Sequence, residues 1–169
     1  MKVTLGDSYS ISDITEGDKA AYVEHLQEKQ IYDNILAIPY PYTAADADWW
    51  LANGNLKRNW AIRRSDGFLI GCVGFQDPEP FGLHRAELGY WLAKPYWSKG
   101  IMTDAVKAIT EYGFKELGLV RITANVFHFN VGSGKVLVKA GFQLEGVLRN
   151  HYVKGGKIFD GILYAKIKE

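Results

Sequence analysis

The clearest candidate for chemistry is a short run directly before the most regular helical pattern of the chain, Trp97-Ser98-Lys99-Gly100-Ile101-Met102-Thr103. We call residues 97–103 the cradle loop. The amino terminus of a helix presents unpaired backbone N–H groups and a partial positive charge, which suit a phosphate group. Gly100 lets the backbone approach a ligand closely, and Lys99 adds a cation. The run matches neither a Walker loop nor the Gly-x-Gly-x-x-Gly dinucleotide motif, and an ordinary strand-to-helix turn is the alternative.

Cysteine and histidine offer little further chemistry. The single cysteine, Cys72, lies in the apolar run 69–75, and we interpret it as a buried structural thiol rather than a nucleophile. One cysteine excludes an intrachain disulfide framework and a cysteine-cluster metal site. The four histidines are too scattered to form a metal site: His25, His84, His128 and His151. We therefore expect no metal.

The elements that must position the cradle loop follow a mixed α/β pattern. Apolar residues recur at helical spacing from 102 to 117, and shorter helices are predicted near 18–26, 44–52 and 133–140. Strands are predicted near 9–14, 60–63, 68–75, 86–92, 120–126, 142–147 and 158–167. Hairpin turns are indicated by Ser65-Asp66-Gly67 and Lys154-Gly155-Gly156-Lys157, and a polar connection by residues 77–84. No repeat or low-complexity linker interrupts this pattern, so we expect one domain over residues 1–169.

The composition is that of an ordinary globular protein. The 169 residues are 47% hydrophobic and 23% charged, with a formal net charge of +1. This balance predicts no strong attraction to nucleic acid or to a membrane surface. The amino terminus lacks the apolar core of a signal peptide, and no apolar stretch approaches the roughly 20 residues of a membrane span. A cytoplasmic location is expected.

An ordered set of motifs extends the pattern over nearly the whole chain. Glu87-Leu88-Gly89-Tyr90-Trp91-Leu92 precedes the cradle loop, and Asn130-x-x-Ser133 and Lys139-Ala140-Gly141-Phe142 follow it. Further pieces are Ile38-Pro39-Tyr40-Pro41-Tyr42-Thr43, Glu145-Gly146-Val147-Leu148-Arg149 and Tyr164-Ala165. Together, from about residue 11 to 167, the chain resembles the GNAT superfamily of N-acetyltransferases. Within that superfamily it is most similar to the branch of the ribosomal-protein N-terminal acetyltransferases.

The resemblance implies a fold and a coenzyme. The implied fold is the α/β GNAT fold, a mixed, mostly antiparallel central sheet of about seven strands, splayed in the middle, with about four helices on both faces. The strand 121–126 would diverge from its neighbour and open a slot for the thioester of acetyl-CoA, the expected cosubstrate. Backbone N–H groups of the cradle loop would hold the diphosphate, contributed by Ser98, Lys99, Gly100, Ile101, Met102 and Thr103. The pantetheine arm would contact Tyr90, Trp91, Leu92 and Asn130.

The resemblance also implies direct attack of a primary amine on the thioester, without a covalent enzyme intermediate. We interpret Glu87 as the candidate base, because its apolar neighbours would raise its pKa; a surface carboxylate paired with Arg85 or Arg121 is the alternative. Tyr152 stands where some relatives carry a carboxylate, and it would act through a water or shape the acceptor pocket. Ser133 would donate a proton to the leaving thiolate, or simply serve as a helix N-cap.

The chain departs from the usual pattern of the family at several positions. Trp97 replaces a glutamine or arginine, and Met102 replaces a small residue. Gly134 stands where an arginine is common, and Val138 where a glutamate is common. Because the expected phosphate contacts are mainly from the main chain, the first two departures are compatible with coenzyme binding.

Three functions remain open at this point. The acceptor implied by the branch is the α-amine of a protein N-terminus, ribosomal proteins included. A small amine such as a polyamine, an amino acid or an amino sugar is the second possibility. The third is a non-catalytic acyl-CoA-binding module. No nucleic-acid or membrane partner is expected, and the resemblance is compatible with a monomer or a homodimer.

Overall fold

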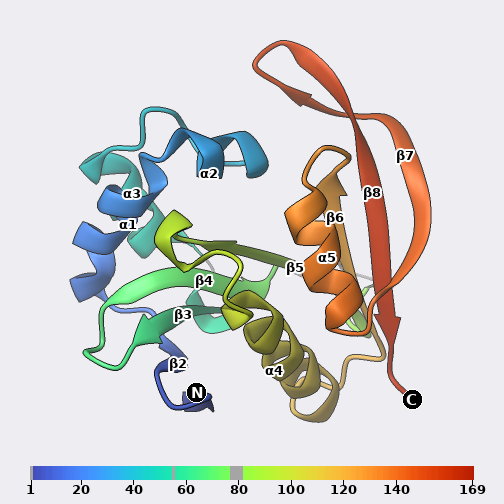
Figure 1. Ribbon diagram of the computed structural model, residues 1–169, viewed down its shortest axis with the longest axis horizontal. Coiled ribbons are helices and arrows are strands. Elements are labelled where there is room, and N and C mark those ends of the chain that lie inside the picture. The colour runs from blue at the N-terminus through green and yellow to red at the C-terminus, as the bar shows by residue number, and fades with distance from the viewer. Residues whose placement is uncertain (1, 55, 77–81) are drawn as a thin grey trace.

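A computed structural model describes residues 2–54, 56–76 and 82–169, and within these ranges the fold is organised around one eight-stranded sheet (Figure 1). The strand order is β1-β2-β3-β4-β5-β6-β8-β7, and every neighbouring pair is antiparallel except β5 and β6. The strands are β1 (Lys2–Leu5), β2 (Tyr9–Asp13), β3 (Asn59–Arg64), β4 (Leu69–Phe75), β5 (Arg85–Leu92), β6 (Arg121–Phe127), β7 (Gln143–Lys154) and β8 (Lys157–Ile167).

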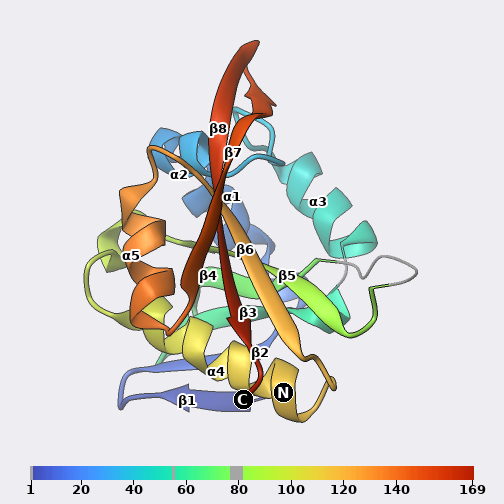
Figure 2. The same cartoon turned by 90° about the vertical axis from the view of Figure 1, so that its right-hand side faces the viewer.

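Helices cover both faces of the sheet (Figure 2). One buried apolar cluster joins the sheet to α1 (Lys19–Leu26), α2 (Lys29–Asn34) and α3 (Ala44–Asn53). The other cluster joins the opposite face to α4 (Ile101–Lys115) and α5 (Val131–Lys139). The remaining helical turns are the 3₁₀ segments η1 (Glu16–Asp18), η2 (Leu56–Arg58) and η3 (Lys94–Tyr96). Among the described residues, no helix is long and apolar enough to cross a bilayer.

The predicted α/β fold, with a mixed, mostly antiparallel sheet and helices on both faces, is confirmed, with one strand and one helix more than expected in the described ranges. The extra strand is β1, and the extra helix is α2, which has six residues and ends before the proline-rich segment. The segment 143–154 is one long strand rather than ending at 147, and its register shifts between Leu148 and Tyr152. Within that irregularity, Asn150 has a φ of +51° and donates its N–H to the Asp160 carboxylate at 2.7 Å. Of the expected polar connection, residues 77–81 lie outside the described residues.

The central feature of the sheet is the divergence of β5 from β6. Their parallel pairing covers only Arg85 with Arg121, Ala86 with Ile122 and Glu87 with Thr123. Beyond this point β5 continues to Leu92 against β4, while β6 continues to Phe127 against β8. Figure 1 shows the two strands leaving in different directions. The expected splay is therefore present, and it begins directly after Glu87.

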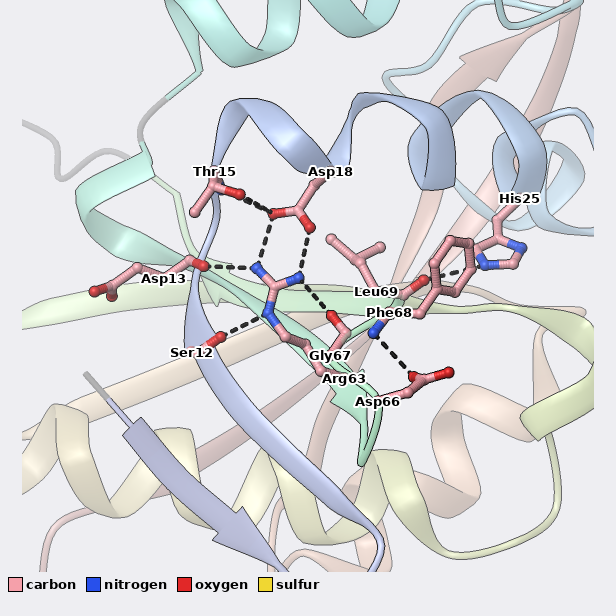
Figure 3. A network of polar contacts seen from close by, with 10 residues as sticks. All are labelled: Ser12, Asp13, Thr15, Asp18, His25, Arg63, Asp66, Gly67, Phe68 and Leu69. Atoms are coloured by element: carbon pink, nitrogen blue, oxygen red, sulfur yellow. Dashed lines mark hydrogen bonds and ion pairs between the residues drawn. The ribbon is translucent and has the colours of Figure 1, made fainter.

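The amino-terminal helices are fixed to the sheet by a buried ion pair (Figure 3). The Arg63 guanidinium on β3 donates to both carboxylate oxygens of Asp18, at 2.5 and 2.8 Å. Its other N–H groups donate to the Ser12 hydroxyl at 2.7 Å and to the carbonyls of Asp13 and Gly67 at 2.8 and 3.1 Å. Asp18 is 5% exposed. Since a guanidinium has five N–H donors, all of them are engaged, and the start of α1 is held against β2 and β3.

Candidate active site

The cradle loop has the backbone expected of an anion-binding turn. Ser98 and Gly100 both adopt left-handed conformations, with φ of +61° and +82°. Such positions turn successive N–H groups toward one concave surface. The helix α4 begins immediately afterwards and no side chain caps it, so the N–H groups of its first turn keep their capacity to bind a ligand. A Cβ atom on Gly100 would meet nothing within 4 Å, which leaves its surface open.

The side chains of the cradle loop point in different directions. Those of Ile101 and Met102 are buried in the cluster beneath α4, so only their main chain can face a ligand. Lys99 is exposed, and its ammonium lies 5.4 Å from the centre of the Tyr96 ring. The Trp97 indole donates to the Leu92 carbonyl at 2.6 Å and thereby ties the loop to the end of β5. This contact gives Trp97 a structural role at the position where the family usually has a glutamine or arginine.

The splay leaves one edge of β5 without a strand partner among the described residues. Glu87 accepts from the N–H of Gln76, and Ala93 donates to Ile70, so alternate main-chain groups of β5 face β4. By this alternation, the main-chain groups of Tyr90 and the N–H of Leu92 face the open edge, while the Leu92 carbonyl accepts from the Trp97 indole. The prediction that Tyr90 and Leu92 bind the pantetheine through their main chain stays compatible with the geometry.

Trp91 has a different environment from its neighbours. Its main-chain groups point toward β4, where it pairs with Cys72. Its ring packs 5.6 Å from the Tyr22 ring and 6.3 Å from the His25 ring, on the α1 side of the sheet. The expected main-chain contact of Trp91 with the coenzyme is therefore not supported, and its structural role is in the core.

Ser133 and Tyr90 meet across the splay. The Tyr90 hydroxyl lies 2.6 Å from the Ser133 hydroxyl and donates to the Ser133 carbonyl at 3.3 Å in one of its possible orientations. Burial raises the pKa of Tyr90 above its usual value, so the phenol is protonated at neutral pH. The alternative of Ser133 as an N-cap is wrong, because Asn130 holds that position and accepts the Ser133 N–H at 3.1 Å.

Gly134 lies beside the same cluster. A Cβ atom at this position would come within 2.8 Å of the Tyr164 hydroxyl. The space that a larger residue would need is thus filled by Tyr164, which explains the glycine where relatives often carry an arginine.

Glu87 lies at the point of the splay, on the face opposite to Tyr90. Its carboxylate accepts from the Gln76 amide at 3.1 Å, and the Asn125 side chain lies beside it. Burial raises the pKa of Glu87, although the Asn125 hydrogen bond and the charge of His151 act in the opposite direction. The alternative of a pair with Arg121 is not observed, because Arg121 makes a two-bond ion pair with Glu145.

Tyr152 lies close to Glu87, on β7. Its ring packs edge-on against Phe127, with ring centres 5.2 Å apart. Burial and the charge of Glu87 raise the pKa of Tyr152, so its phenol is protonated at neutral pH. This environment fits a wall of the acceptor side or a hydrogen-bond donor, and it disfavours a role as a base.

The hairpin of β7 and β8 bounds this side of the splay. The Lys154 ammonium, at the tip of the hairpin, donates to the carbonyls of Tyr32 and Ile35 at the end of α2. It also lies 3.8 Å from the centre of the Tyr32 ring. These contacts join the tip of the hairpin to the end of α2, on the face of the sheet from which Glu87 projects.

Cys72 is buried in the cluster beneath α1, as predicted. Burial raises the pKa of its thiol to about 12, which leaves it protonated and unreactive at neutral pH.

Sequence patterns did not single out Gln76 or Asn125, the two residues beside the Glu87 carboxylate. The sequence offers no local signal for either residue, because the register that pairs Glu87 with Thr123, two positions before Asn125, is set by the fold.

Comparison with known proteins identifies the same family that the sequence motifs resemble. Residues 10–143 match the acetyltransferase (GNAT) domain. The uncharacterized N-acetyltransferase YoaA of Bacillus subtilis is 39% identical over 110 residues, which cover 64% of this chain and 62% of YoaA. Other relatives bear the names of ribosomal-protein N-acetyltransferases. The chain spans about half to two thirds of the length of the first curated relatives that it matches.

Solved structures extend the similarity to nearly the whole chain. An acetyltransferase of the GNAT family from Bacillus anthracis is 26% identical with a TM-score of 0.86, covering 99% of this chain and 98% of that one. The ribosomal L7/L12 α-N-protein acetyltransferase RimL, solved in complex with coenzyme A, shares the fold at 19% identity, with a TM-score of 0.87 and coverage of 99% and 98%. The matched domain covers well over half of the chain, and the chain therefore belongs to the GNAT family of acetyltransferases.

Proposed function

We propose that this protein transfers an acetyl group from acetyl-CoA to a primary amine, by direct attack within a ternary complex. The observation that carries the proposal is the splay between β5 and β6. It separates an uncapped helix terminus with a left-handed glycine from a half-buried carboxylate, Glu87, on the other face of the sheet. Residues 1–169 would form one N-acetyltransferase domain.

The main chain would hold the coenzyme. The N–H groups of residues 98–103 suit the diphosphate, because an anion at an uncapped helix terminus receives both hydrogen bonds and a favourable dipole. The open edge of β5 at Tyr90 and Leu92 suits the pantetheine amides, which would pair with it like an added strand. Asn130 at the start of α5 lies on the same side. Acetyl-CoA, when bound, supplies an activated thioester carbonyl.

The side chains of Glu87 and Ser133 would carry out the proton transfers. A protein α-amine has a pKa of about 8 and a lysine side chain of about 10.4, so either acceptor arrives largely protonated at neutral pH. Glu87 would accept that proton, since burial brings its pKa closer to that of the amine. Ser133 Oγ would hold a proton for the leaving sulfur, and the Tyr90 hydroxyl, 2.6 Å away, would orient it.

We favour a protein N-terminal α-amine as acceptor, as the names of the ribosomal-protein acetyltransferase relatives suggest. Such an acceptor would be met in the cytoplasm.

The direct test is a thiol-release assay with acetyl-CoA against peptides with free α-amines, polyamines, amino acids and amino sugars, combined with calorimetry of coenzyme A binding. Turnover confined to small amines would refute the favoured acceptor. Tight coenzyme binding without turnover of any acceptor would refute the enzymatic proposal and leave an acyl-CoA-binding module.

A further inference from the structure

The side chain of Asn125 carries an unsatisfied acceptor beside Glu87. Its Oδ1 atom is buried and has no hydrogen-bond partner among the described residues. Leaving a buried polar atom unpaired costs about 1–3 kcal/mol, and such atoms are rare in folded proteins. An orphaned oxygen at a proposed active site therefore points to a partner that arrives with the substrate.

The orientation of the amide follows from its neighbour. The Asn125 side chain lowers the pKa of Glu87 as a hydrogen-bonding neighbour, which requires that its NH₂ group face the Glu87 carboxylate. Turning the amide over would place Oδ1 against that carboxylate, where two acceptors repel each other. The orphaned atom is thus the carbonyl oxygen, and it needs a donor.

Strand geometry places this oxygen on the acceptor side. Ile122 and Ala124 belong to the cluster beneath α4, so Thr123, Asn125 and Phe127 project from the other face of β6. Thr123 is the register partner of Glu87, which also projects from that face. Asn125 is two residues further along β6, past the point where the strands diverge. It therefore flanks the splay from the strand opposite to Glu87.

We propose that Asn125 Oδ1 accepts a hydrogen bond from the acceptor amine while Glu87 takes its proton. The inference rests on the proposed function and names an amine-binding residue for it. A primary ammonium has three N–H donors. One N–H proton passes to Glu87, and the lone pair left behind stays on nitrogen. One of the two remaining N–H groups stays on Asn125, which orients the lone pair.

The arrangement also selects the chemical class of the acceptor. A hydroxyl has a single hydrogen, so it cannot serve Glu87 and Asn125 at the same time. An alcohol in this position would leave Oδ1 unpaired, whereas a primary amine satisfies both oxygens. The pair therefore favours transfer to nitrogen over transfer to oxygen.

The test compares Asn125→Leu with Gln76→Met, since each variant removes one donor to Glu87 and only the first removes the orphaned acceptor. With the best amine from the thiol-release panel, Asn125→Leu should raise the acceptor KM about tenfold or more, the usual effect of losing a hydrogen bond to a charged group. Gln76→Met should change that KM much less. Neither variant should change the Kd of coenzyme A measured by calorimetry.

Thermal unfolding of the ligand-free protein supplies a readout that is independent of turnover. Because Oδ1 has no partner, replacing Asn125 with a leucine of similar size should cost no more stability than Gln76→Met. Unfolding of Asn125→Leu at a clearly lower temperature than Gln76→Met would show a structural partner and overturn the inference. Equal KM effects of the two variants, or weaker binding of coenzyme A by Asn125→Leu, would also overturn the inference. Absence of turnover with every amine would refute the proposed function, and this inference with it.

Discussion

The cradle loop can be tested by placing a charge on Gly100. Gly100→Asp adds a carboxylate at the amino terminus of α4, and Gly100→Asn adds a neutral side chain of the same shape. Both residues tolerate the left-handed conformation better than most, and a Cβ atom here meets nothing within 4 Å. The two variants should therefore fold alike, and the carboxylate should even gain some stability from the helix dipole.

The effect on coenzyme binding follows from charge. A carboxylate about 5 Å from a phosphate costs about 3 kcal/mol at an effective dielectric constant of about 20, a factor of about 150 in Kd. Calorimetry with coenzyme A should therefore show strong weakening for Gly100→Asp and a much smaller loss for Gly100→Asn. Added salt should narrow the difference, because the loop is exposed.

The matched control is Gly67→Asp, in the turn between β3 and β4. Gly67 has a φ of +87°, and a Cβ atom there also meets nothing within 4 Å, so the backbone cost is the same as at Gly100. It should lower the melting temperature without changing the Kd of coenzyme A. Wild-type affinity in Gly100→Asp, or equal losses in Gly100→Asp and Gly100→Asn, would refute electrostatic recognition of a diphosphate at this loop.

Three further outcomes are expected. Glu87→Gln should reduce kcat most where the amine is still protonated and much less at high pH, with the Kd of coenzyme A unchanged; an unaltered pH–rate profile would remove Glu87 from the mechanism. Burial acts to raise the pKa of Asp18, but hydrogen bonds from Arg63 and Thr15 outweigh it and lower that pKa in the folded state. The ion pair of Asp18 with Arg63 therefore stabilises the fold above the unfolded pKa of about 3.9. This stabilisation is lost as the pH falls through the lower pKa that Asp18 has in the folded state. Asp18→Asn should then lose about 3–5 kcal/mol in chemical denaturation at pH 7, with the deficit shrinking in acid. Gly134→Ala should destabilise the fold by about 1–3 kcal/mol through its clash with the Tyr164 hydroxyl, and Tyr164→Phe should recover part of that loss in the double variant.

Local patterns in the sequence were sufficient for most of the fold. The apolar spacing of α4, the turn at Gly67 and the helical segment near 44–52 each depend on a few neighbouring residues, and each appears where it was predicted. The four-residue strand β1 and the six-residue helix α2 are too short to produce a clear period.

The site was harder to read, because its details depend on contacts distant in sequence. The motif around Tyr90 indicated a coenzyme-binding strand, but only the register with β4 shows that Trp91 faces away from the open edge. The N-cap of α5 could have been Asn130 or Ser133, since both residue types cap helices well. Asn125 has no local signal, because its meaning depends on Glu87, which lies on another strand.

The short junction between β5 and β6 has a mechanical consequence. With three residue pairs, it is the shortest strand pairing among the described residues, and the apolar cluster under α4, which combines Val73 and Phe75 with Ile122 and Ala124, packs across it. A molecule bound between the diverging strands β5 and β6 would contact both and hold the two parts of the sheet together. Amide hydrogen exchange should therefore slow together in β4 and in β8 when coenzyme A binds, although neither strand need touch it.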